Sequence, residues 1–528
     1  MIPWSAVSEW GTHTVGDGLD EISFIYIFQR LGENLWTWSR PIWDGRMLYP
    51  ATDSLIYSET MTLPAFVFHG LYRVTNNFVL SYHLLLFIIC WGNAALMYWC
   101  SRKWFSRPVA MTLALFFTYS VIRLTHLRHT HCFPQMGFPL AAGFLLNWER
   151  TRKMKWAAWA GFAVALQYYL SVTLGSILTV SLIPYILWRL RDPASRRAAI
   201  RPFAGALLVF TLVAFPLGSA YVHCSLEHRF VRTLDNTIAY GANLKSFFVV
   251  PPEHRYSSWL TDGLAGGEKG ARHEKALFLG FAGYLLLFLG IRSLNRRYPK
   301  NPDKKMIYLS LGFVLLVAMG RNVGLYNLLY YIFPLMKGMR TPSRFSFSYL
   351  FLSLFLMGFG LTALLEWVKP RWQKALLFST IVGIMILDNQ FYSPRFPLVP
   401  TLENAAKYLS RTPDEEPVIF IPMRSTDRKQ AMQMYYSLFH PHPIANGYSG
   451  FLPPIYNVLV GASYEWQDGK SKRLLALLSQ HDIPYLVLEK DAFSPERSRE
   501  LVGESLSEGF VRVYEDAGAV VLKRTKPN

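Results

Sequence analysis

The residues nearest the start of the chain that could do chemistry form a short acidic segment. Residues 16–21 (GDGLDE) place three carboxylates within five positions, and Glu59 follows in a Tyr-Ser-Glu run. A carboxylate can take the proton of an attacking hydroxyl or hold a divalent metal against a phosphate. Acids are also common at helix N-termini, where capping and the helix dipole favour them. We treat Asp17 and Asp20 as candidate catalytic residues, and Glu21 and Glu59 as candidate substrate-binding residues.

A second set of polar residues is basic and lies far from the acids along the chain. Arg123, His126 and His129 follow an apolar stretch, and Arg340 and Arg344 precede another. Cations at such positions could stabilise the charge that develops on a departing phosphate. Arginine at the end of a membrane helix also commonly extends to lipid headgroups, which is the plain alternative for Arg123. We treat all five as candidate substrate-binding residues.

The residues that usually bind metals give little support for a metal centre. The four cysteines form no CxxC pair, so a cysteine-based zinc or redox site is not expected. His126, His129 and His131 contain no i, i+4 pair, the helical spacing typical of zinc-binding histidines. No cofactor is therefore assigned, and Mg²⁺ or Mn²⁺ at the acidic segment stays an open alternative.

The composition is that of a membrane protein. Of the 528 residues, 52% are hydrophobic and only 17% are charged, whereas a soluble domain usually has about 25% charged residues. The net charge of +19 could suggest a nucleic-acid partner. Instead, the basic residues gather in short loops between apolar stretches, near residues 102–107, 150–155, 189–201, 292–305 and 369–374. The positive-inside rule explains this pattern, so we expect no nucleic-acid partner.

The chain has ten apolar stretches, and every second loop between them is one of these basic loops. A membrane-spanning helix needs roughly 20 residues, and the stretches lie at residues 77–99, 106–122, 132–148, 156–170, 172–188, 203–222, 275–291, 306–320, 344–367 and 374–388. Placing the basic loops in the cytoplasm puts residues 1–76, 223–274, 321–343 and 389–528 outside. The stretch 323–336 is too short to span and is expected to be re-entrant or interfacial.

The predicted fold class is a polytopic α-helical membrane protein with a C-terminal extracytoplasmic α/β domain. Residues 1–76 form a first extracytoplasmic segment with amphipathic helices, residues 77–388 the transmembrane bundle, and residues 389–528 the α/β domain. Residues 1–14 have neither the basic region nor the apolar core of a signal peptide. Because this tail is placed outside, we favour a lost first helix over a short tail that crosses the membrane unaided.

The C-terminal residues show alternating helix and strand patterns, which indicate a small α/β domain. Asn-Gly at 446–447 and Ser-Gly at 449–450 mark turns. We expect a structural or substrate-gating role, because the domain has no Gly-rich phosphate loop or nucleophile elbow. The predicted helices are 402–410, 474–479 and 497–507, and the predicted strands are 418–421, 485–488, 511–513 and 519–522.

The order of several motifs resembles the bacterial membrane glycosyltransferases of the GT-C class, in particular an uncharacterised YfhO-like branch. The motifs are G-D-x-x-D near the start, a later x-L-Y-P, an S-E before the next helix, an R-x-x-H at the end of a stretch, and Arg-Thr-Pro-Ser-Arg at 340–344. The resemblance covers most of the chain. Two departures are the absent helix before the first loop and Thr60, where similar sequences often have His.

The resemblance implies a polyprenyl-phosphate sugar donor bound in the membrane and an acid of the first outer loop that acts as base. By position, that acid is Asp17 or Asp20, with Glu59 as a further acid. It also implies an inverting transfer that modifies an envelope glycan, lipid or protein acceptor, and a multi-pass protein of the bacterial inner membrane that contacts membrane lipids. Two alternatives remain: a transporter or flippase of lipid-linked precursors, and a non-catalytic envelope assembly protein.

Overall fold

The chain folds into many helices and one small sheet. The computed structural model describes residues 9–264, 272–390, 396–423 and 426–525, so residues 1–8 of the predicted N-terminal tail lie outside the described part. Two compact units can be distinguished, which we call unit 1 (residues 86–220 and 230–394) and unit 2 (residues 2–85, 221–229 and 395–528). Unit 2 thus joins most of the predicted first segment to the predicted C-terminal domain.

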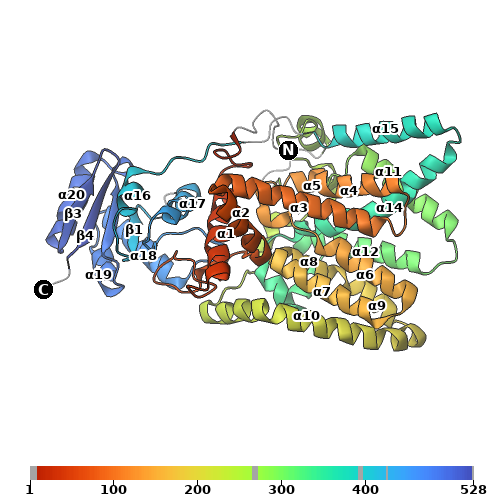
Figure 1. The fold of residues 1–528 in the computed structure, drawn as a ribbon, viewed down its shortest axis with the longest axis horizontal. Coiled ribbons are helices and arrows are strands. Elements are labelled where there is room, and N and C mark those ends of the chain that lie inside the picture. The colour runs from red at the N-terminus through yellow and green to blue at the C-terminus, as the bar shows by residue number, and fades with distance from the viewer. Residues whose placement is uncertain (1–8, 265–271, 391–395, 424–425, 526–528) are drawn as a thin grey trace. The chain divides into compact units, whose positions relative to one another are not determined.

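Unit 1 is helical, and each of the ten apolar stretches contains a helix (Figure 1). Prolines at the first turns of α4 and α9 fit these starts, because proline has no N–H to lose there. The residues of α3 (Phe78–Ser101) and α10 (Pro193–His228) are divided between the two units. The other helices are α4 (Arg107–Tyr119), α5 (Val121–Leu124), α6 (Gly137–Thr151), α7 (Met154–Leu170), α8 (Val172–Ser181), α9 (Ile183–Leu190), α11 (Phe281–Arg297), α12 (Asp303–Ala318), α13 (Leu325–Ile332), α14 (Ser346–Trp367) and α15 (Arg371–Asp388).

Four helical segments of the described chain are long and apolar enough to cross a membrane by themselves: Phe78–Ser101, Val172–Leu190, Pro193–His228 and Pro342–Trp367. On α10, Leu207, Leu212 and Phe215 are 63%, 67% and 67% exposed. An apolar surface of this kind is what a lipid-facing helix presents. The full count of ten spans and the side of each loop stay predictions.

The predicted cytoplasmic loops lie together at one end of unit 1. Arg150, in the last turn of α6, donates to the carbonyl of Lys103, after α3, at 2.6 Å. Arg189 of α9 contacts Glu149 at 2.6 Å and Asp303, at the start of α12, at 3.0 Å. Arginines on successive basic loops therefore link the helix ends that the charge pattern assigns to one side.

Helices α11 and α14 pack backbone against backbone. A Cβ at Gly290 of α11 would lie 1.8 Å from the carbonyl oxygen of Leu356, and one at Gly360 of α14 would lie 2.1 Å from that of Leu286. Small residues allow such approach, which is common between membrane helices. This pair fixes α14, the helix that follows Arg344 in the chain.

Unit 2 contains a four-stranded sheet in the order β1-β2-β4-β3, with β1 and β2 parallel and the other pairs antiparallel. Every predicted C-terminal helix and strand is confirmed. Helices α17 (Asp427–Tyr436) and α18 (Pro454–Gln467) were not predicted. The other elements are α16 (Asn404–Leu409), β1 (Val418–Ile421), α19 (Arg473–Gln480), β2 (Tyr485–Glu489), α20 (Pro495–Ser507), β3 (Phe510–Glu515) and β4 (Ala519–Arg524).

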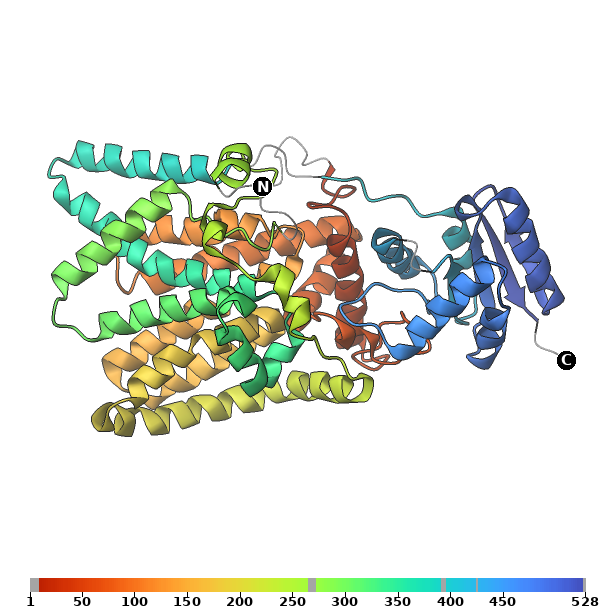
Figure 2. The same cartoon turned by 180° about the vertical axis from the view of Figure 1, so that it is seen from behind.

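The N-terminal residues of unit 2 fold together with its C-terminal residues (Figures 1 and 2). They form α1 (Asp20–Thr37) and α2 (Thr62–Thr75), and α1 packs against α17. Backbone bonds run from Leu48 N to Asn446 O at 3.1 Å and from Ile444 N to the Arg46 carbonyl at 3.0 Å. The acidic segment is therefore anchored to the α/β part of the chain.

Candidate functional site

The acidic segment of unit 2 is organised around one buried carboxylate. Glu21 has no exposed surface and accepts hydrogen bonds from the backbone N–H groups of Asp17, Gly18 and Leu19 at 3.2, 3.1 and 3.2 Å. Burial, followed by repulsion from Asp17, raises the pKa of Glu21 well above its usual range. The carboxyl group of Glu21 is thus committed to its own loop, in which it positions the two neighbouring acids.

Glycines make this loop sterically feasible. Gly16 has φ +112°, and a Cβ there would lie 1.4 Å from Oε1 of Glu21. Gly18 has φ +76°, in the left-handed region that favours glycine. The GDGLDE pattern therefore encodes a tight wrap around Glu21.

Asp17 and Asp20 lie at the surface of this wrap and are each partly exposed. Asp17 Oδ1 accepts from the Leu19 N–H at 3.2 Å, and Asp20 Oδ1 accepts from the Tyr448 hydroxyl at 3.2 Å. The exposed Arg428 side chain comes close to the same loop, 3.5 Å from where a Cβ of Gly18 would be. Two accessible carboxylates on a rigid support suit proton abstraction.

Glu59 lies apart from that loop in the chain and is also partly exposed. Its two neighbours bind one side chain: the Tyr221 hydroxyl donates to the Ser58 carbonyl at 2.7 Å and receives the Thr60 N–H at 3.2 Å. Thr60 therefore contributes to the placement of Glu59 through its backbone.

Three of the predicted cationic residues meet in unit 1 around Glu274, an acid that the sequence analysis missed. Arg344 donates from Nε and Nη2 to the two Glu274 oxygens at 3.0 and 2.6 Å. His126 contacts Oε2 at 3.1 Å and His129 contacts Oε1 at 3.4 Å. His131 receives Nη1 of Arg344 at 2.6 Å. One carboxylate thus ties the segment after α5 to the start of α14.

The charges of this cluster balance in a buried setting. The Arg344 and Glu274 side chains are 9% and 7% exposed. Burial alone would raise the pKa of Glu274, but Arg344 and the hydrogen bond from His126 outweigh it and hold the pKa well below its usual range. Burial and Arg344 lower the pKa of His131, which accepts from Arg344 as a neutral imidazole must. The positive charge of the Arg344 guanidinium is thereby balanced by the negative charge of Glu274.

Arg123 is placed differently. It is 1% exposed, donates to the Phe133 carbonyl, and lies over the rings of Phe117 and Phe133 at 5.2 and 5.5 Å. Its Nε and Nη1 have no hydrogen-bond partner among the described residues. Arg123 therefore does not extend to the surface as a headgroup-seeking side chain would, and it keeps donors for an anion.

Arg340 is not part of the Glu274 cluster. It is exposed, and its guanidinium lies over the ring of Tyr240, 5.8 Å from the centroid. Arg340 and Arg344, which the sequence analysis treated together, therefore have separate surroundings. The acids Asp17, Asp20, Glu21 and Glu59 belong to unit 2, and the five cationic residues belong to unit 1.

Glu274 carried one sequence signal that could have singled it out. It is an acid between His273 and Lys275, next to the start of the apolar stretch 275–291. An ionisable residue at the edge of a predicted span needs a partner. Its partners, however, lie 148 and 70 positions away in the chain, so sequence spacing could not identify them.

The donor set around Glu274 does not suit a metal ion. Three histidines and one carboxylate surround the position, but both oxygens of Glu274 bind the Arg344 guanidinium. Within the described residues, no group of three or more His, Cys, Asp or Glu side chains is arranged to hold a metal. We derive no step through Mg²⁺ or Mn²⁺.

Solved structures of membrane glycosyltransferases share the fold of this chain. The archaeal oligosaccharyltransferase AglB of Archaeoglobus fulgidus, in complex with an inhibitory peptide and a dolichol-phosphate, matches with TM-score 0.53 and 13% identity over 99% of this chain and 72% of its own. ArnT of Cupriavidus metallidurans matches with TM-score 0.50 and 12% identity over 98% and 95%. The mycobacterial arabinofuranosyltransferase AftD matches with TM-score 0.59 and 13% identity over 96% and 39%.

The expected likeness to GT-C enzymes is thus confirmed at the level of the fold. A search of curated proteins finds no match to the chain. At the level of sequence, residues 10–388 match the family described as Domain of unknown function (DUF6311), and the chain belongs to that family.

Proposed function

We propose that the protein is an integral-membrane glycosyltransferase that takes a sugar from a polyprenyl-phosphate carrier and transfers it to an envelope glycan, lipid or protein. The observation that carries this proposal is a fold likeness over nearly the whole chain to AglB, whose structure holds a dolichol-phosphate, and to AftD, an arabinofuranosyltransferase. The finer assignments, a YfhO-like branch and the bacterial inner membrane with an extracytoplasmic C-terminal domain, belong to the same proposal.

Asp17 acts as the base in this mechanism. The acceptor hydroxyl loses its proton to the Asp17 carboxylate while its oxygen attacks the anomeric carbon, and the bond from that carbon to the lipid phosphate breaks. Attack opposite to the leaving group inverts the anomeric centre. Support for Asp17 comes from its partial exposure and from the loop that Glu21 fixes. Asp20, bound to Tyr448, is the second candidate.

The leaving group carries a growing negative charge, which a cation must stabilise. Among the arginines of unit 1 that the sequence singled out, we assign this role to Arg123, because two of its guanidinium nitrogens have no partner in the described structure. Arg344 has a carboxylate partner already and acts as a positioning residue. Apolar helix surfaces such as that of α10 supply contacts for a prenyl chain.

A transfer assay tests the proposal. Purified protein in detergent receives a polyprenyl-phosphate-linked sugar and an envelope acceptor fraction, and loss of donor and gain of product are followed together. Asp17→Asn is expected to lower the rate by on the order of 10²–10⁴ while donor binding persists. Full activity of both Asp17→Asn and Asp20→Asn would overturn the assignment of the base. Donor translocation without any bond cleavage would favour the flippase alternative.

A further inference from the structure

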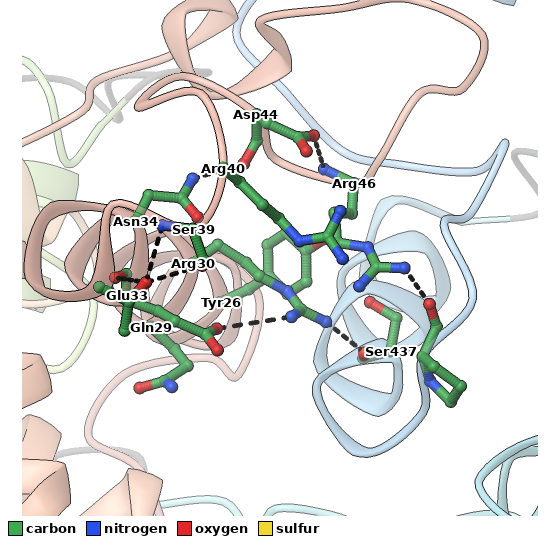
Figure 3. A network of polar contacts seen from close by, with 12 residues as sticks. Tyr26, Gln29, Arg30, Glu33, Asn34, Ser39, Arg40, Asp44, Arg46 and Ser437 are labelled. Carbon is green, nitrogen blue, oxygen red and sulfur yellow. Dashed lines mark hydrogen bonds and ion pairs between the residues drawn. The ribbon is translucent and has the colours of Figure 1, made fainter. Parts of the chain in front are cut away.

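A cluster of three arginines lies in unit 2, outside the residues discussed so far. Arg40 and Arg46 both contact Oε2 of Glu415, at 2.7 and 3.2 Å. Arg46 also donates to the Pro441 carbonyl, and Arg30 donates to the Ser437 carbonyl at 2.6 Å. Figure 3 shows the three guanidinium groups extended from α1 and the loop after it toward the segment that contains Ser437.

The loop that presents two of these arginines is built rigidly. Asn34, which is 3% exposed, donates from Nδ2 to the carbonyls of Pro41, Ile42 and Asp44 at 3.2, 3.1 and 2.8 Å. Figure 3 shows Asn34 beside Asp44. The Asp44 carboxylate accepts the Arg46 N–H at 2.9 Å. The positions of Arg40 and Arg46 are thereby fixed before any ligand arrives.

Two buried donors of the cluster have no partner. Within the described residues, Nε of Arg30 and Nε of Arg46 form no hydrogen bond. His440 is 5% exposed. Burial and the charges of His442, Arg30 and Arg46 lower its pKa to about 3, so its imidazole is neutral. Buried polar groups normally find a partner, so these donors indicate a missing one.

The charges of the cluster also favour an added anion. Burial and repulsion from Arg30 and Arg40 lower the pKa of Arg46, whereas Glu415 works in the opposite direction. Glu415 is 56% exposed, and Glu33 is 41% exposed and 3.7 Å from Arg30. Arg30 and Arg46, whose side chains are 12% and 9% exposed, are thus more buried than the acids near them. An oxyanion could relieve this repulsion with charge-assisted hydrogen bonds.

A purely structural reading explains only part of the arrangement. The contacts of Arg30 and Arg46 with the Ser437 and Pro441 carbonyls join the two chain segments of unit 2. The one polar partner of Arg40 in the described structure is the exposed Glu415. An exposed ion pair of this kind contributes little to stability, so Arg40 adds positive charge that the fold does not need.

We propose that Arg30, Arg40 and Arg46 bind a phosphate or carboxylate group of the acceptor, at the position that the Glu415 carboxylate now takes. The Glu415 carboxylate carries the negative oxygens that such a ligand would present, and its Oε2 contacts both Arg40 and Arg46. The assignment to the acceptor rests on the proposed transferase function, but the anion site itself does not. The Glu415 side chain then competes with the ligand for the arginines and moves away from them when the ligand binds.

The test measures anion binding by the full-length protein in detergent. The thermal unfolding midpoint is followed against inorganic phosphate and, separately, acetate, with sodium chloride at equal ionic strength as the reference. Phosphate or acetate should raise the midpoint more than chloride does. The anion that gives the larger rise shows whether the site prefers a phosphate or a carboxylate. Glu415→Gln should tighten binding on the order of fivefold, since it removes the competing charge but keeps the shape. Arg40→Met should weaken it on the order of tenfold.

The matched controls come from a surface ion pair of the same unit, Arg512 with Glu515 at 2.5 Å, in which Glu515 also contacts Lys490 at 2.7 Å. Arg512→Met and Glu515→Gln should leave anion binding unchanged. The proposal is wrong if phosphate and acetate act as chloride does, or if Arg40→Met and Glu415→Gln behave as these controls do. Transfer that fails in the Asp17 assay while anion binding follows the expected pattern would overturn the proposed function and leave the anion site. If transfer is intact but anion binding does not follow the expected pattern, the anion site is overturned and the proposed function stands.

Discussion

Arg344 holds Glu274 through two parallel hydrogen bonds, from Nε at 3.0 Å and from Nη2 at 2.6 Å, in a region where each side chain is less than a tenth exposed. The pair joins the loop before α11 to the start of α14. Removal of one partner from a buried pair leaves an uncompensated charge, which costs more than the pair itself contributes.

Glu274→Gln is therefore expected to destabilise the protein by about 3–5 kcal/mol. The double variant Glu274→Gln with Arg344→Gln should recover part of that loss, because neither charge is then left alone. Denaturant unfolding in detergent measures both. If the double variant loses as much stability as the two single variants lose in total, Glu274 and Arg344 are not energetically coupled and the prediction is wrong.

Stability should also depend on pH through His273. Burial and the charge of Arg128 lower its pKa to about 4, so the folded protein holds this imidazole neutral. An unfolded histidine takes a proton below about pH 6.5. Unfolded chains thus bind more protons between pH 6.5 and pH 4, and stability falls as the pH drops through that range.

His273→Gln should flatten this part of the pH profile. Unfolding midpoints measured from pH 7 to pH 4.5 in matched buffers give the comparison. His481, on the C-terminal side of α19, serves as the control position, and His481→Gln should leave the slope as it is. An unchanged slope in His273→Gln would show that other groups produce the pH dependence.

Gly16→Ala should disrupt the acidic loop. A Cβ there meets Oε1 of Glu21 at 1.4 Å, and φ of +112° is unfavourable for alanine. Strain of about 1–3 kcal/mol is expected. Gly461 of α18 is the matched position, since a Cβ there meets nothing within 4 Å. Gly461→Ala should be neutral or stabilise by about 0.5–1 kcal/mol, as alanine favours helix. Thermal unfolding compares the two, and equal effects would contradict the tight wrap.

Arg123 gives a prediction on activity. If it stabilises the departing lipid phosphate, Arg123→Gln should lower kcat by about 10²–10³, and Arg123→Lys should restore part of it. Arg321, exposed and paired with Asp235 at 2.5 Å, is the control. Transfer rates are compared only between variants with equal unfolding midpoints, because Arg123 is buried. Full activity of Arg123→Gln would exclude it from the site.

The sequence predicted the elements of this protein better than their assembly. Apolar stretches of about the right length become helices whatever their neighbours are, and the C-terminal strands follow from short β-branched runs between turns. Helix α17 was missed because its residues, DRKQAMQMYY, have no apolar periodicity, although most of them are buried. Gln430 and Gln433 are buried by contacts with distant parts of the chain, and the local sequence of polar and apolar residues does not show this.

The candidate site shows the same limit. The GDGLDE segment could be singled out because its acids are adjacent, and its glycines imply an unusual backbone. Glu274 could not be matched with Arg344 and His126, nor Arg30 with Ser437, 407 positions away, because these contacts depend on the folded arrangement of distant segments. Local chemistry was therefore predictable, whereas the partner of each charge was not.

The touching backbones of α11 and α14 limit how unit 1 can change shape. With no side chain between Gly290 and Leu356, a slide by one turn would drive a larger residue into a carbonyl group. The two helices therefore move as one body, and any change in the shape of unit 1 has to come from the helices around them.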